Sequence, residues 1–152
     1  MKTITIIYHS LTGHNEAMAK AVAEGAMAAG AKINLKKAIE ATAGDVLNCD
    51  AVVFGSPNYF SYMAGAIQMI LEKAFVELAK NEVTKPYAVF SCGGSMGGDE
   101  PIAAIEKICD RFGGKFGKFK FERIAKSISA TQEPSPQILE QCRELGKKIA
   151  LS

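Results

Sequence analysis

The sequence predicts an α/β fold built on a doubly wound parallel sheet of five strands. Five short segments rich in β-branched and apolar residues recur along the chain, and amphipathic helical patterns separate them. The third segment, Ala51–Phe54, is apolar throughout, as expected for a parallel strand that is buried on both faces. Because crossovers between parallel strands are right-handed, few strand orders are common, and five strands favour the order 2-1-3-4-5.

Length and composition predict one domain, spanning residues 1–152, with no nucleic-acid or membrane partner. The net charge is only +2, and basic residues are interspersed with acidic ones. No apolar run approaches the ~20 residues that a bilayer span needs, and the N-terminus lacks the pattern of a signal peptide. The cysteines are widely spaced, without a metal-binding pattern: Cys49, Cys92, Cys109 and Cys142. We therefore expect reduced thiols, no metal site and a cytoplasmic location.

The N-terminal half is predicted to contain a strand, a helix, an edge strand, a weak helical turn and a central strand. Their expected ranges are Thr3–Tyr8, about 15–29, 32–36, 40–47 and 51–54. The first helix separates apolar from charged residues, and Gly30 is suited to end it. The second strand is partly polar, which favours a position at the edge of the sheet.

The C-terminal half begins with the strongest helical period in the chain, from about residue 66 to 80. A fourth strand is expected at 87–90 after Pro86, and a helix follows Asp99 and ends at Gly113-Gly114. Ser135-Pro136 is suited to cap and start a last helix.

The fifth strand is the least regular prediction. Between Phe116 and Ser129, Phe119 and Phe121 alternate with charged residues, but Ile124 and Ile128 do not keep that register. We expect one irregular strand across this segment.

In a sheet with this order, ligands bind where the strand order reverses. The loops after the first, third and fourth strands, residues 9–15, 55–65 and 91–99, should converge there. The first loop leads directly into a helix, whose first N–H groups lack intrahelical acceptors and attract anions. Ser10, Thr12 and Asn15 add polar side chains, and Gly13 lets the backbone approach the ligand. Since the loop has neither the lysine of a P-loop nor a three-glycine fingerprint, we predict a phosphate monoester as its ligand.

The other two loops have unusual compositions. Tyr59, Phe60 and Tyr62 stand where polar turn residues are expected, so they either cover a flat apolar ligand or form a small satellite core. The third loop is rich in glycine, which lets the backbone approach a ring closely or makes the connection merely flexible.

Two other functions that suit such a fold are excluded by the residues present. Gly93–Gly97 matches the Gly-x-Ser-x-Gly motif of hydrolases, but both histidines, His9 and His14, precede the serine instead of following it. A receiver-type phosphorylation switch needs acidic side chains where this chain has His9-Ser10 and Gly55-Ser56.

The first loop, Ser10-Leu11-Thr12-Gly13-His14-Asn15, resembles the flavodoxin phosphate loop Ser/Thr-x-Thr-Gly-x-Thr, with Asn15 replacing the last hydroxyl residue. The chain is also similar to flavodoxin-like quinone oxidoreductases of the Trp-repressor-binding-protein type, though shorter. That similarity lies in Gly13-His14, Phe54-Gly55-Ser56-Pro57 and Met63-Ala64-Gly65. The resemblance implies a flavodoxin-like fold and bound FMN, with the phosphate on the first loop and the ring between the other two.

FMN itself supplies the redox chemistry, so no catalytic side chain is expected. The resemblance leaves two functions open: an electron carrier between redox partner proteins, and an NAD(P)H-dependent oxidoreductase that reduces a quinone or a similar small acceptor. The residues expected to bind FMN lie on the three loops: Ser10, Leu11, Thr12, Gly13, His14, Asn15, Pro57, Asn58, Tyr59, Phe60, Tyr62, Ser91, Cys92, Gly93, Gly94, Gly97 and Asp99.

Overall fold

The computed structural model describes residues 1–114 and 117–152. Its parallel sheet has the order β2-β1-β3-β4-β5, and a further short strand, β6, also pairs with β4. The predicted fold class and strand order are therefore confirmed. The strands are β1 (Thr3–Tyr8), β2 (Lys32–Lys37), β3 (Ala51–Ser56), β4 (Thr84–Cys92), β5 (Lys120–Arg123) and β6 (Ile128–Ala130).

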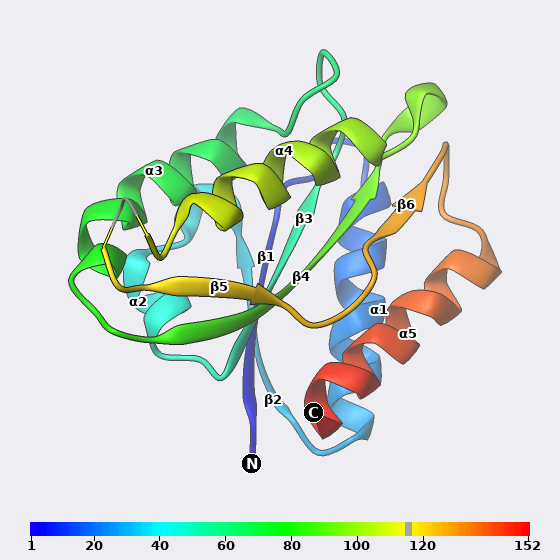
Figure 1. Ribbon diagram of the computed structural model, residues 1–152. Coiled ribbons are helices and arrows are strands. Elements are labelled where there is room, and N and C mark those ends of the chain that lie inside the picture. Colours follow the sequence, from blue (N-terminus) through cyan, green and yellow to red (C-terminus); the bar gives the residue numbers. More distant parts are fainter. Residues whose placement is uncertain (115–116) are drawn as a thin grey trace.

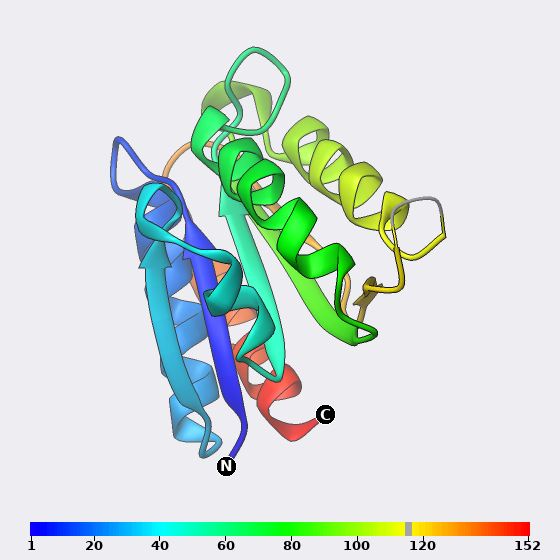
Figure 2. The same cartoon turned by 90° about the vertical axis from the view of Figure 1, so that its left-hand side faces the viewer.

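Helices cover both faces of this sheet (Figures 1 and 2). One face is covered by α1 and α5, and the other by α2, α3 and α4. The helices are α1 (His14–Ala28), α2 (Ala43–Leu47), α3 (Gly65–Ala79), α4 (Asp99–Arg111) and α5 (Pro136–Leu151), with short 3₁₀ turns η1 (Ala38–Glu40) and η2 (Gly94–Met96). Ser135 caps α5 through a bond from the Ile138 N–H, and Pro136 opens the helix, as the sequence predicts.

Two hydrophobic layers form because successive strand residues point to opposite faces. In β1, Ile4 and Ile6 pack toward α1 and α5, whereas Ile7 packs toward α3. All six residues of β3 are buried, which fits the central position that its apolar sequence predicts. No helix in the described part of the chain is long and apolar enough to cross a membrane.

The expected single fifth strand is wrong. The chain instead forms β5 beside the start of β4 and β6 beside its end. Phe119 and Phe121 pack into the layer of α3 and α4, but Ile128 and Ala130 pack into the layer of α1 and α5. Four residues, 124–127, separate β5 from β6, whereas only Ala88 and Val89 separate their paired residues in β4. The chain therefore leaves the ladder at this point, which explains the broken register. Phe116, where the predicted strand begins, lies outside the described residues.

The fourth strand is longer than predicted at both ends. Pro86, which we expected to precede it, lies within β4 opposite Glu122 of β5. At the other end, Ser91 and Cys92 belong to the strand and are buried, so the third loop begins at Gly93.

Candidate functional site

The loops that follow β1, β3 and β4 meet at one edge of the sheet, because these three strands are neighbours and run in the same direction. The first loop bonds to β3, because the His9 N–H donates to the Gly55 oxygen at 3.1 Å. The second loop bonds to the third loop, because Nδ2 of Asn58 donates to the Gly97 oxygen at 3.0 Å. The structure thus brings the three candidate loops together.

The first loop ends at the N-terminus of α1, which is open to a ligand. Gly13 precedes α1 with φ 92°, a left-handed conformation that favours glycine, and no side chain caps the helix. Ser10 Oγ accepts a bond from the Gly13 N–H at 3.1 Å, which tightens the loop. A pocket of about 450 Å³ lies over this turn and is lined by residues 8–13, Glu16, Lys37 and Ile39. An uncapped helix N-terminus facing a pocket is a favourable place for an anion.

Several residues of this pocket were not predicted. Lys37 reaches it because the last residue of β2 lies opposite Tyr8 in the register of the sheet. The Tyr8 hydroxyl donates to Glu16 Oε1 at 3.1 Å. Burial raises the pKa of Tyr8, and the neighbouring carboxylate of Glu16 raises it further. The predicted strand order contained the signal for Lys37, since it made the second strand a neighbour of the first.

Asn15 is buried beneath the first loop and does not line the pocket over α1. Its side chain is only 3% exposed, and both ends of the amide contact the last residue of β4. Nδ2 donates to the Cys92 oxygen at 3.0 Å, and Oδ1 accepts from the Cys92 N–H at 2.9 Å. The Asn15 side chain therefore links the phosphate-loop candidate to the start of the third loop.

The second loop forms a small hairpin that projects beyond the adjacent helix ends (Figures 1 and 2). Tyr59 and Tyr62 exchange backbone bonds of 3.0 and 3.1 Å, and the two residues between them have positive φ, 58° at Phe60 and 61° at Ser61. Tyr59 packs edge-on against His9, with ring centroids 6.0 Å apart. Phe60 is 99% exposed, so it belongs to no satellite core, and a fully exposed aromatic ring is available to a ligand.

The third loop is tightly packed rather than merely flexible. A Cβ atom on Gly93 would lie 1.6 Å from the Gly97 oxygen, and one on Gly98 would lie 2.6 Å from the Ser91 oxygen. Asn58 also donates to Glu100 Oε1 at 2.8 Å, so two acceptors fix the orientation of its amide. Asn58 Oδ1 is buried and has no hydrogen-bond partner among the described residues. A buried acceptor of this kind is suited to a donor from a ligand.

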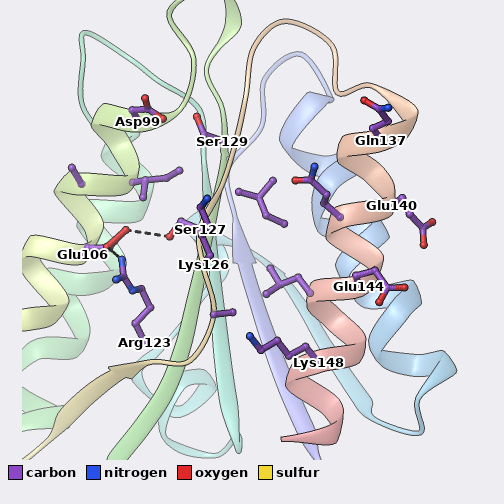
Figure 3. Close-up of a pocket in the computed structure, with 16 residues that line it drawn as sticks. Asp99, Glu106, Arg123, Lys126, Ser127, Ser129, Gln137, Glu140, Glu144 and Lys148 are labelled. Carbon is purple, nitrogen blue, oxygen red and sulfur yellow. Dashed lines mark hydrogen bonds and ion pairs between the residues drawn. The ribbon is translucent and has the colours of Figure 1, made fainter.

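A larger hollow of about 1080 Å³ lies elsewhere, between α4, the β5–β6 connection and α5 (Figure 3). Some of its polar groups already bond to one another: Glu106 accepts from Ser127 at 3.1 Å and pairs with Arg123. The rest of its lining includes both acidic and basic side chains. The three loops converge on one place, and the uncapped N-terminus of α1 offers backbone N–H donors there. We therefore place the candidate site at the three loops, although this hollow is larger.

Comparison with known proteins agrees with this geometry. The model of the flavodoxin family matches residues 6–146. The chain belongs to the flavodoxin family. Proteins of this fold bind FMN at the switch point between β1 and β3, where the loops described above converge. Family membership confirms that the protein is an FMN-binding redox protein.

The chain is similar both to a flavodoxin and to a quinone dehydrogenase. A flavodoxin of Aquifex aeolicus is 28% identical over 159 aligned positions, which cover 99% of this chain and 86% of that protein. NAD(P)H dehydrogenase (quinone) 3 of Rhizobium meliloti is 34% identical over 121 residues, which cover 66% of this chain and only 57% of that protein. A solved flavodoxin from the domain Archaea superposes with a TM-score of 0.80 at 19% identity, covering 98% of this chain and 96% of that one.

Proposed function

We propose that this protein carries electrons between redox partners through FMN bound across its three loops. The observation that carries this proposal is the uncapped N-terminus of α1 and the pocket over it. The phosphate would bind to the first-turn N–H groups of α1 and to the hydroxyls of Ser10 and Thr12. Lys37, at the rim of the same pocket, would offset part of the phosphate charge.

The ring of FMN would lie between the second and third loops. Tyr59, Phe60 and Tyr62 supply aromatic surface on one side, and the backbone from Gly93 to Gly97 supplies polar groups on the other. Oδ1 of Asn58 offers an acceptor to a ring N–H. FMN, when bound, supplies the electron-transfer chemistry, and the protein orients the ring and limits its contact with water.

An NAD(P)H-dependent quinone oxidoreductase is the second candidate. It is supported by the similarity to a quinone dehydrogenase and by apolar side chains exposed around the site. Leu11 is 75% exposed and Met96 is 58% exposed, and both lie on loops that border the candidate ring site. Such a rim would suit a small apolar acceptor. For either function we propose a cytoplasmic location, which the four free buried thiols support.

One anaerobic experiment separates the two functions. Purified protein reconstituted with FMN is mixed with NADH or NADPH, and the visible flavin absorbance is followed. A carrier keeps its oxidised spectrum for many minutes but is bleached by dithionite, whereas an oxidoreductase is bleached within seconds. Free FMN at the same concentration serves as the control. Failure of the protein to retain FMN during gel filtration would contradict both functions.

A further inference from the structure

The amide of Asn15 completes the hydrogen bonding of a strand to which it does not belong. The Gly93 N–H donates to the Ala130 oxygen of β6, so the neighbouring backbone groups of Cys92 point the other way, toward β3. However, β3 ends at Ser56, which pairs with Ser91, so Cys92 lies beyond the last paired residue of β3. The Asn15 amide bonds to both backbone groups of Cys92: Nδ2 donates to the oxygen at 3.0 Å, and Oδ1 accepts from the N–H at 2.9 Å.

This contact joins the start of α1 to the end of β4, between residues that are 77 positions apart in the sequence. Cys92 leads directly into Gly93, whose Cα atom is packed against the Gly97 oxygen. The Gly97 oxygen in turn accepts the bond from Asn58 of the second loop. A displacement of Asn15 would therefore reach all three loops, because the third loop has little free space in which to absorb it.

We propose that Asn15 is a positioning residue that couples the phosphate-binding start of α1 to the ring-binding third loop. The proposal rests on the proposed FMN site, but it adds a distinct role. In the flavodoxin pattern this position carries a hydroxyl residue, which suits a phosphate ligand. Here the buried amide of Asn15 bonds to the backbone of Cys92. Replacing Asn15 should therefore weaken binding of the flavin ring, and not only binding of the phosphate.

Riboflavin distinguishes the two roles because it has the ring of FMN but lacks the phosphate. The test variant is Asn15→Thr, whose single hydroxyl cannot replace both bonds to Cys92. The matched control is Thr12→Ala, which removes a hydroxyl from the phosphate pocket and leaves the contact with Cys92 intact. Affinities of each protein for FMN and for riboflavin are measured by flavin fluorescence titration.

We expect N15T to weaken FMN and riboflavin binding by a similar factor, on the order of tenfold, since two buried hydrogen bonds are lost. The Thr12→Ala control should weaken FMN binding and leave riboflavin binding unchanged. If N15T instead behaves like the control, Asn15 is only a phosphate ligand and the inference is wrong. If the unmodified protein binds neither flavin, the proposed function itself fails.

Hydrogen exchange of the flavin-free protein tests the coupling without any ligand. The Cys92 amide should be protected in the unmodified protein, and N15T should increase exchange at Cys92 and through Gly93–Gly98, but not in β1. Equal exchange in both proteins would overturn the inference. Should N15T fail to fold, Asn15→Asp keeps the acceptor for the Cys92 N–H but turns a carboxylate oxygen toward the Cys92 carbonyl, and a change of the same pattern is expected.

Discussion

At the scale of single residues, Thr12 tests the phosphate site. Its side chain lines the pocket over α1, so Thr12→Ala should remove one hydrogen bond to a charged oxygen. Such a bond contributes roughly 1.5–3 kcal/mol, which corresponds to a tenfold to hundredfold weaker affinity for FMN. Flavin fluorescence titration measures this change. An affinity equal to that of the unmodified protein would contradict the assignment of the first loop.

The aromatic residues of the second loop offer a complementary test. Because Phe60 is fully exposed, Phe60→Ala should leave the melting temperature of the flavin-free protein unchanged. If Phe60 contacts the ring, the variant should lose part of the stabilisation that FMN adds and part of the fluorescence quenching. Tyr59→Ala and Tyr62→Ala provide the comparison. Equal melting shifts with and without FMN in all three variants would show that the aromatic loop is only structural.

Single residues were predicted correctly from the sequence where local backbone preferences determine the structure. Ser135 and Pro136 were expected to cap and open the last helix, and they do so. The partners of Asn15 were not predicted, because Cys92 is 77 residues away in the sequence and comes beside Asn15 only in the folded sheet. Local sequence carries no signal for a contact of that kind.

At the scale of elements, α1 and α5 pack unusually closely through two glycines. A Cβ atom on Gly25 would lie 1.9 Å from the Arg143 oxygen, and one on Gly146 would lie 2.0 Å from the Val22 oxygen. Alanine is the better helix former by about 1 kcal/mol, but here it must push two backbones apart. Gly146→Ala should therefore reduce the free energy of unfolding, by about 1–3 kcal/mol.

Urea denaturation of the flavin-free protein measures this effect, and Gly44→Ala in α2 is its matched control. A Cβ atom on Gly44 would make only ordinary contacts, the nearest at 3.5 Å, so that variant should be neutral or slightly stabilised. Equal stabilities of the two variants would show that the α1–α5 contact adjusts without cost.

The segment that forms β5 and β6 shows why some elements were harder to predict than others. Helices α3 and α5 have long periodic patterns that their burial reproduces. The segment containing β5 and β6 serves both hydrophobic layers in turn, so no single alternation describes it. Its residues signalled the irregularity, but only the tertiary structure shows that one strand is replaced by two.

At the scale of the whole molecule, sequence periodicity and the handedness of crossovers were sufficient to predict the strand order. Convergence of three loops then followed from topology alone. The charges around the site required the structure. Glu16 and Lys37 both line the pocket over α1, and Glu100 accepts a bond from Asn58, so acidic and basic groups are mixed there.

The overall charge gives the last prediction, which concerns the reduction potential of bound FMN. Full reduction at neutral pH tends to leave a negative charge on the ring, and surrounding carboxylates make that charge costly. This chain has a net charge of +2, unlike a strongly acidic flavodoxin. At an effective dielectric constant near 20, one unit charge ~10 Å away contributes about 1.7 kcal/mol before screening. The second one-electron potential should therefore be less negative than in an acidic flavodoxin, by tens of millivolts. Spectroelectrochemical titration at low and high salt measures it, and a potential that is equally negative and independent of salt would show that local ring contacts outweigh the summed field.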